Sequence, residues 1–365
     1  MSYRYIGNKT RFLTQLMSAT SRFVKPGQTV ADLMCGTASV SAALRTSGYK
    51  VIASDLMTFA VQHATVRLTI DSAPLFSEVG GSYFKVLDYL QSLQPIKGLM
   101  VREYSPGGKP AAGCPPRMYL TELNAGLIDA INQQLNSWNA QKLLTHQEYS
   151  LLRHDLVLAT NRIANIAGTY GHFRSKWSNG SLSKLTLLPS EFVWGFPTDH
   201  LVMQGPAESV SQSLTADLCY LDPPYMKRQY AANYHLIETI ARGDEPEAIG
   251  VSGLRPWRDQ YSDFCSKVRI RDAFSKIISG MNCRMFLISY SEDGLLSREE
   301  MLELFGQFGH AELLESVVPR FRSNNSPLGR TMAEYLFTLE RPAVTFSSQH
   351  SLRQQPRAQH ASDAM

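Results

Sequence analysis

The chain has 365 residues, of which 44% are hydrophobic and 19% are charged, so it can bury a large core and is not a disordered chain. At about 150 residues per domain, this length allows two domains or one elaborated domain. The net charge of only +4 permits a polyanionic partner without requiring one. The five cysteines are scattered and include no C-x-x-C pair, which argues against a disulfide framework and a cysteine zinc site.

No apolar run approaches the ~18 residues of a membrane span, and the N-terminus lacks the apolar core of a signal peptide. We therefore expect a cytoplasmic protein without a membrane partner. The nine histidines show no metal-ligand spacing, so no metal site is expected. Within the middle of the chain, we interpret His146 and His154 as surface or boundary residues.

The first part of the chain, to about residue 70, follows a strand–helix–strand pattern. Residues 29–34 are predicted to form a short buried strand, followed by a turn of small residues over 35–39. A helix over residues 40–46 ends near Gly48, and residues 49–54 form a second strand. Such a unit implies a parallel sheet, because a crossover helix joins parallel strands.

The middle part, residues 71–200, differs in character because it combines Gly/Pro-rich loops with two helical patterns. Apolar residues recur at helical spacing over residues 123–138 and again over residues 152–166, with Gly168 as a plausible stop. We therefore interpret this part as an inserted, mainly helical lobe.

The third part, residues 201–341, returns to strands that alternate with helices. Residues 218–221, 284–289 and 332–339 are predicted strands. The simplest architecture is one α/β sheet domain built from residues 1–70 and 201–341. The polar tail, residues 342–365, has no apolar periodicity and is predicted to be disordered.

The most specific chemical signal is Asp222-Pro-Pro-Tyr225, directly after a predicted buried strand. Consecutive prolines fix φ near −65° and remove two N–H donors, so the Pro223 carbonyl becomes a rigid acceptor beside the Asp222 carboxylate. Together they can accept both hydrogens of an exocyclic amine such as that of adenine, while the Tyr225 ring stacks on the base. The carboxylate also stabilises the positive charge that develops on nitrogen during methyl transfer. A plain proline turn after a strand is the structural alternative for Asp222, Pro223, Pro224 and Tyr225.

A second signal is the small-residue turn in Asp32-Leu-Met-Cys-Gly-Thr-Ala38. Such a turn lets a ligand approach the backbone beside a helix N-terminus. Asp55 ends the next predicted strand about 20 residues further on, where a ribose diol would sit. Only Gly36 remains of the three-glycine dinucleotide fingerprint, which argues against NAD. By itself the pattern fits both nucleoside binding and ordinary sheet packing.

A third signal is Tyr5-Ile-Gly-Asn-Lys9. A glycine between an aromatic residue and a lysine suits a loop that closes over a ligand, with Lys9 pairing with a carboxylate. A solvent-exposed N-terminal lysine is the simpler interpretation of this motif when it stands alone.

Taken together and in this order, the three motifs resemble those of the D12 class of adenine-N6 DNA methyltransferases, in particular the FokI type. The likeness continues in Arg228-Gln-Tyr230, in residues 233–240 and 287–294, and in Glu334-Tyr-Leu-Phe337. It covers about residues 3–341. The chain departs from the family pattern at Met34, where an aromatic is usual, and at Ala38, where a second glycine is usual.

The resemblance implies a Rossmann-like methyltransferase sheet, with residues 71–200 as a target-recognition lobe and S-adenosylmethionine as the methyl donor. It implies that Tyr5, Gly7 and Lys9 hold the amino-acid end of this cofactor. Asp32 and Gly36 would face its sulfonium side and Asp55 its ribose, while Asp222, Pro223, Pro224 and Tyr225 carry the transfer. Before the catalytic strand, where the family has an acidic residue, the segment 205–208 offers Glu208.

Double-stranded DNA is the expected partner, and the target base must be flipped out of the duplex because its amine is otherwise unreachable. Residues 156–190 contain no Asp or Glu, and residues 172–177 interleave aromatic and basic side chains, as a nucleic-acid contact would. A solvated loop is the alternative. The residues that we expect to contact DNA are Arg174, Lys176, Trp177 and Lys184.

We therefore expect a site-specific DNA adenine-N6 methyltransferase, with a cognate restriction endonuclease as a candidate partner. Methylation of cytosine at N4 is the nearest alternative, since its exocyclic amine poses the same chemical problem. A non-catalytic DNA-binding protein that kept the fold is the alternative from another class, although the intact Asp222-Pro-Pro motif argues against it.

Overall fold

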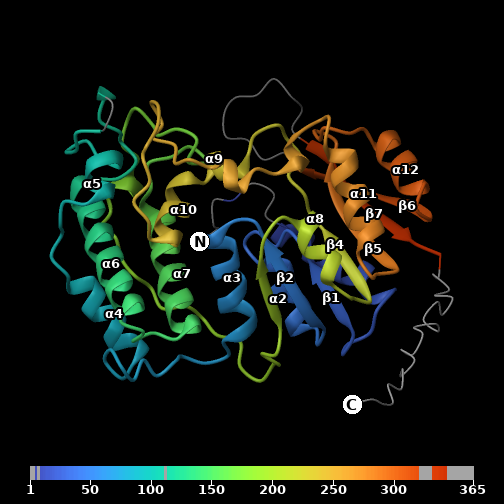
Figure 1. Cartoon of the computed structure of the whole chain (residues 1–365), viewed down its shortest axis with the longest axis horizontal. Coiled ribbons are helices and arrows are strands. Elements are labelled where there is room, and N and C mark those ends of the chain that lie inside the picture. The colour runs from blue at the N-terminus through green and yellow to red at the C-terminus, as the bar shows by residue number, and fades with distance from the viewer. Residues whose placement is uncertain (1–4, 6–8, 111–112, 320–330, 343–365) are drawn as a thin grey trace, which may run out of the picture.

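The computed structural model describes residues 5, 9–110, 113–319 and 331–342, and the tail from residue 343 lies outside them. Its described residues form a seven-stranded sheet in the order β3-β2-β1-β4-β5-β7-β6 (Figure 1). Strands β1 to β5 are parallel, whereas β7 runs antiparallel to both β5 and β6. This sheet confirms the predicted Rossmann-like α/β fold class. The strands are β1 (Thr29–Asp32), β2 (Lys50–Asp55), β3 (Leu201–Gln204), β4 (Leu218–Leu221), β5 (Met285–Ser291), β6 (His310–Pro319) and β7 (Thr331–Glu340).

Helices cover both faces of this sheet, which explains why its central strands are mostly apolar and deeply buried. Every residue of β4 and β5 is buried. One face packs against α1 (Leu13–Ser21), α2 (Ser39–Thr46) and α3 (Thr58–Thr69). The other packs against α8 (Ala207–Val210), α11 (Ile270–Gly280) and α12 (Arg298–Gly306).

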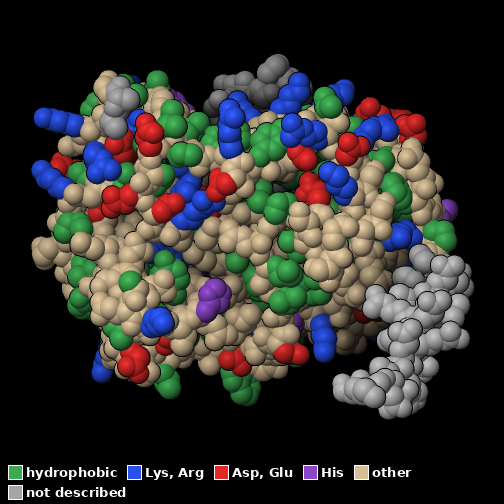
Figure 2. Space-filling model, viewed as in Figure 1, with side chains coloured by type: hydrophobic (Ala, Val, Ile, Leu, Met, Phe, Trp, Pro, Cys, Tyr) green, Lys and Arg blue, Asp and Glu red, His purple; other side chains and the backbone are tan. Residues whose placement is uncertain are grey.

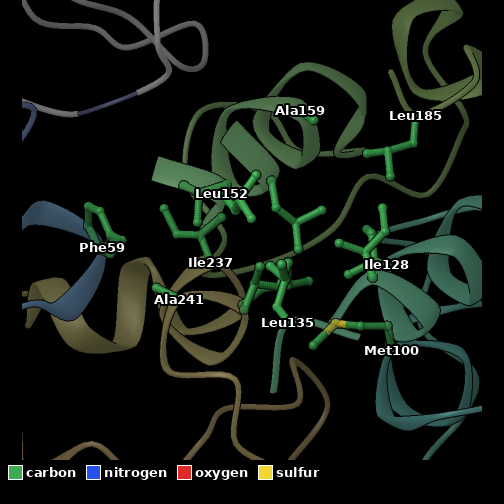
Figure 3. Packing of buried hydrophobic residues seen from close by; sticks show 14 of the residues in the cluster. Phe59, Met100, Ile128, Leu135, Leu152, Ala159, Leu185, Ile237 and Ala241 are labelled. Atoms are coloured by element: carbon green, nitrogen blue, oxygen red, sulfur yellow. The ribbon is translucent and has the colours of Figure 1, made fainter. Parts of the chain in front are cut away.

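A second hydrophobic core joins a cluster of helices to the sheet through α3 (Figure 3). Side chains such as Phe59 of α3, Leu152 of α7 and Ile237 of α10 meet in this core. The cluster therefore extends beyond residues 71–200, because α3 and α10 share its core. Its members are α4 (Tyr83–Ser92), α5 (Leu99–Tyr104), α6 (Glu122–Ala140), α7 (His146–Ile163) and α10 (His235–Arg242).

The two long helices of the middle part begin with side-chain caps. Thr121 accepts a hydrogen bond from the Asn124 N–H at the start of α6, and Thr145 forms a capping box with Glu148 at the start of α7. Helix α7 ends at Ile163, earlier than the predicted stop at Gly168, because the chain is already extended at the next residue.

The interpretation of His154 as a surface or boundary residue was wrong, whereas His146 is exposed. His154 is buried on α7, and its Nδ1 lies 2.6 Å from the Nδ1 of His63 on α3. Burial lowers the pKa of His154 to about 3 and that of His63 well below its ordinary value, so both rings are neutral and share one Nδ1–H···Nδ1 hydrogen bond between the two helices.

Buried polar contacts fix α10 over the end of β2. The Glu238 carboxylate on α10 accepts hydrogen bonds from the Thr58 and Phe59 N–H groups, at the N-terminus of α3, where a negative charge is favoured. Gln260 donates to Glu238 at 2.7 Å and to the Leu56 carbonyl at 3.0 Å.

Among the described residues, no helix has the length and apolar character needed to cross a membrane.

Candidate active site

Three neighbouring parallel strands each bring an aspartate to the same edge of the sheet. Asp55 and Asp32 end β2 and β1, and Asp222 directly follows β4. The strand order reverses between β1 and β4, and ligands of such sheets bind in the crevice at this point. A cavity of about 330 Å³ opens there, and all three aspartates line it.

Gly36 lies where the turn after β1 meets the end of β2. Its N–H donates to Oδ2 of Asp55 at 2.8 Å, and the Met57 N–H donates to Oδ1 at 2.9 Å, so both carboxylate oxygens are oriented. Burial raises the pKa of Asp55 to about 6. Each oxygen keeps a further lone pair, which fits it to accept a hydroxyl group.

The aromatic ring of Tyr5 covers Gly36 so closely that only glycine fits. Gly36 has a φ of +51°, and a Cβ at this position would stand 2.9 Å from the Tyr5 ring. The ring stacks on Tyr234, with 4.9 Å between the centroids. Ala38 has a φ of +54°, a left-handed conformation that glycine adopts without strain. This explains why the family pattern has a glycine where this chain has alanine.

Asp32 lies in the floor of the cavity with one carboxylate oxygen unpaired. The Ser41 hydroxyl donates to Oδ2 at 2.6 Å, whereas Oδ1 has no hydrogen-bond partner within the described part of the chain. Burial raises the pKa of Asp32 to about 7, and the nearby charges of Asp222 and Asp55 add to the rise. A buried unpaired carboxylate oxygen is costly unless a ligand supplies a donor or a positive charge. The site therefore fits a cationic group such as an ammonium or a sulfonium.

Asp222 presents one carboxylate oxygen to the protein. The Tyr225 hydroxyl donates to Oδ1 at 2.7 Å, and Nζ of Lys9 lies 3.1 Å from the same oxygen. No described residue forms a hydrogen bond with Oδ2, so this oxygen is available to a ligand in the cavity. Burial raises the pKa of Asp222, although Lys9 and Tyr225 counteract the rise. Pro223 and Pro224 line the cavity beside it.

Lys9 is 4% exposed and lies beneath this motif. Its ammonium contacts three oxygen atoms: Oδ1 of Asp222, Oε1 of Glu334 and the hydroxyl of Tyr225. Burial opposes the charge of Lys9, but the two carboxylates outweigh it and raise its pKa. An ammonium has three N–H groups, so these contacts use all of them. The expected contact of Lys9 with the cofactor stays a prediction, whereas its contact with Asp222 is part of the structure.

The cavity brings together all the predicted catalytic and cofactor residues that the structure describes, while Gly7 lies outside the described residues. Glu208 also lines it, and burial raises the pKa of that carboxyl. The sequence analysis placed Tyr230 and Glu334 in segments that resemble the family without giving them a role, and it did not single out Gln260, because nothing local to these residues signals their distant partners. The predicted residues that line the cavity are Tyr5, Lys9, Asp32, Gly36, Asp55, Asp222, Pro223, Pro224 and Tyr225.

The predicted DNA contacts lie outside the cavity. Arg174 and Lys176 are exposed on a segment whose Tyr170 N–H donates to the Asn233 carbonyl of α9 (Tyr230–Asn233) at 2.8 Å. Helix α9 in turn lines the cavity through Tyr230 and Ala231.

The other two predicted DNA contacts differ in exposure and position. Trp177 is half-buried, and Lys184 is exposed. Lys184 lies beside the start of α6, because Asn124 there bonds to Ser183 and Leu185.

Further cations near the catalytic motif were not among the predicted contacts. Lys227 and Arg228 are exposed and follow Tyr225 almost directly. Figure 2 shows Lys and Arg side chains gathered along the upper edge of the molecule, in the region of α9. The signal for Lys227 and Arg228 was present in the sequence as a basic pair beside the motif.

Comparison with known proteins identifies the family. The model of the D12 class of N6 adenine-specific DNA methyltransferases matches residues 5–304. The type II methyltransferase M.FokI of Planomicrobium okeanokoites is 31% identical over 94% of this chain and 54% of its own length. The modification methylase StsI of Streptococcus sanguinis is 30% identical, over 93% of this chain and 52% of its own. The chain thus spans about half the length of these two relatives.

A third relative is matched over almost its whole length. The type II methyltransferase M.NlaIII of Neisseria lactamica is 29% identical over 92% of this chain and 99% of its own. Among solved structures, the rRNA methyltransferase AviRa of Streptomyces viridochromogenes aligns with 12% identity over 92% of this chain and 88% of its own, at a TM-score of 0.32. The match of the family model over most of the sequence is decisive: the chain belongs to the D12 class of N6 adenine-specific DNA methyltransferases.

Proposed function

We propose that the chain transfers a methyl group from S-adenosylmethionine to the exocyclic amine of a flipped adenine in DNA. The observation that carries this proposal is the position of Asp222 at the switch point of the sheet, with Oδ2 available in the cavity that Asp32 and Asp55 also line. Membership of the D12 class supports both the base and the methyl donor.

The residues of the cavity fit the two ends of S-adenosylmethionine. When bound, it would supply a methyl carbon activated by a sulfonium. We assign the ribose hydroxyls to Asp55, whose oxygens are already oriented by two backbone N–H groups. The positive end of the cofactor is assigned to the part of the cavity beside Asp32, whose buried Oδ1 has no partner among the described residues. Gly36 and Tyr5 would form the wall beside it.

At the target base, Asp222 and Pro223 would orient the amine. Oδ2 of Asp222 accepts one N–H and the Pro223 carbonyl the other, which exposes the nitrogen lone pair to the methyl carbon. The ring of Tyr225 would stack on the base. As the nitrogen gains positive charge, the carboxylate of Asp222 stabilises it. Because burial raises the pKa of Asp222, this group is also suited to accept the proton that the nitrogen then loses.

DNA would lie over the exposed cations around α9. We assign Arg174, Lys176, Trp177 and Lys184 to this surface, and residues 71–200 to target recognition. Residues 1–70 and 201–341 would form the catalytic domain. Phosphate contacts of this kind position the duplex without reading its sequence.

Two finer expectations belong to this proposal. Relatives named as modification methylases support a role in restriction and modification, with a cognate endonuclease as partner. A cytoplasmic location stays a prediction.

Methyl transfer to DNA tests the proposal directly. Unmethylated genomic DNA is incubated with tritium-labelled S-adenosylmethionine and the chain, then digested to nucleosides for mass spectrometry. We expect label in N6-methyladenine, and loss of nearly all of it in Asp222→Ala. The exposed Asp199 provides a matched control, and Asp199→Ala should behave as wild type. Label in N4-methylcytosine would favour the cytosine alternative, and no label at all the non-catalytic one. An Asp222→Ala variant within about tenfold of wild type would refute the role of this carboxylate.

A further inference from the structure

Two carboxylates share the same pair of donors beneath the catalytic motif. Glu334 is 7% exposed on β7, and its Oε1 contacts both the ammonium of Lys9 and, at 3.2 Å, the hydroxyl of Tyr225. The same two groups contact Oδ1 of Asp222, at 3.1 and 2.7 Å. The four side chains therefore form a closed arrangement around one ammonium.

The number of donor protons on Tyr225 and Lys9 decides which hydrogen bonds form among the four side chains. Tyr225 has a single hydroxyl proton, and its shorter contact, to Asp222, is the one that it favours. Lys9 supplies one N–H to each of its three oxygen neighbours. Oδ1 of Asp222 is therefore held from two sides, while Oδ2 has no partner among the described residues.

The charges explain what Glu334 adds. With Asp222 as its only counter-ion, Lys9 would lower the basicity of that carboxylate further. Glu334 provides a second negative charge for the same ammonium. Its backbone is fixed by the β5–β7 ladder, in which Glu334 pairs with Ser291 at the end of β5.

We propose that Glu334 is a positioning residue for methyl transfer: it holds Lys9 and the Tyr225 hydroxyl so that Asp222 keeps Oδ2 turned toward the target amine. This inference rests on the proposed function and adds to it a residue 112 positions beyond Asp222 in the sequence. Glu334 itself does not line the large cavity, so it acts through its two partners.

Glu334→Gln tests this role, because it keeps the shape of the side chain and removes its charge. We expect kcat to fall about 10- to 100-fold, the range typical of residues that orient a functional group, with little change in KM for the methyl donor. The acidic limb of the kcat profile should also move to lower pH, because Lys9 would then act on Asp222 alone. Glu340→Gln is the matched control, since Glu340 lies on the same strand and pairs with Arg284 at the surface.

A second pair of variants separates positioning from a general effect on folding. In a Lys9→Met background, Glu334→Gln should cause a clearly smaller further loss, because one of the two groups through which it acts is absent. This comparison also applies if Glu334→Gln alone folds poorly. Wild-type kcat and an unchanged pH profile in Glu334→Gln would overturn the positioning role, as would an equal loss in both backgrounds. A wild-type chain that transfers no methyl group would overturn the proposed function itself.

Discussion

Binding of the methyl donor is expected to weaken at low pH, because the Asp32 carboxylate, whose Oδ1 has no partner among the described residues, must be ionised to receive a cation. Burial raises the pKa of Asp32 to about 7, so about one molecule in eleven is ionised at pH 6 and about ten in eleven at pH 8. The dissociation constant should therefore be about tenfold higher at pH 6 than at pH 8. Asp55, with its pKa of about 6, adds about a further factor of two at pH 6.

Isothermal titration calorimetry between pH 6 and pH 8 measures this dependence. Titration with S-adenosylmethionine in buffers of different ionisation enthalpy should also detect release of about half a proton at pH 7. In Asp32→Asn the tenfold component should disappear, whereas the exposed Asp199→Asn should titrate as wild type. A dissociation constant that does not change with pH, or an equal slope in Asp32→Asn, would refute the assignment of the cation to Asp32.

The stability of the ligand-free protein provides an independent check of the same pKa. A carboxyl whose pKa is higher in the folded than in the unfolded chain makes the fold less stable as pH rises through that interval. From an ordinary value of 3.8 to about 7, the cost for Asp32 amounts to roughly 4 kcal/mol above pH 7. Thermal unfolding should therefore find Asp32→Asn more stable than wild type at pH 8, with the difference vanishing near pH 4.

Two further variants test the DNA surface and the turn after β1. Arg174→Ala with Lys176→Ala should weaken DNA binding and reduce the slope of log K against log salt by about two. Lys25→Ala should leave the slope unchanged, because Lys25 precedes β1, at the end of the strands opposite to the cavity. Fluorescence anisotropy over a salt series measures both slopes, and an unchanged slope in the double variant would show that DNA binds to another surface. Gly36→Ala should weaken cofactor binding and destabilise the fold by about 1–2 kcal/mol. The reasons are that alanine is strained at this positive φ and that its Cβ would meet the Tyr5 ring. Wild-type affinity by calorimetry would show that the ring does not restrict this turn.

The sequence predicts those parts of the fold in which local chemistry decides the structure. Strand β4 was predicted with its observed bounds, because a fully apolar run stops at an aspartate followed by two prolines. By contrast, β3 (Leu201–Gln204) escaped prediction because it is a short, partly exposed edge strand without an apolar alternation. Strand β6 (His310–Pro319), at the other edge, mixes acidic and apolar residues. Edge strands need no continuous apolar run, so composition alone does not mark them.

The residues of the candidate site also differ in how far the sequence predicts them. The aspartates at the ends of strands were predictable because each follows a strand signal in its own segment. The contact between Lys9 and Glu334 was not, since 325 positions separate the two residues and only the sheet order brings them together. The burial of His154 was not predicted for a related reason. Its partner His63 lies on another helix, and the helical pattern around His154 gives no sign of that partner.

The place of α10 in the helical cluster has a mechanical consequence. Residues 226–234 are the direct covalent tether from Tyr225 to this helix, whose apolar face is anchored beside α3 and α7. Part of that tether is α9, which also supports the segment carrying Arg174. Any displacement of α10 relative to the sheet would therefore act directly on the loop that presents Asp222, because only these nine residues separate the two.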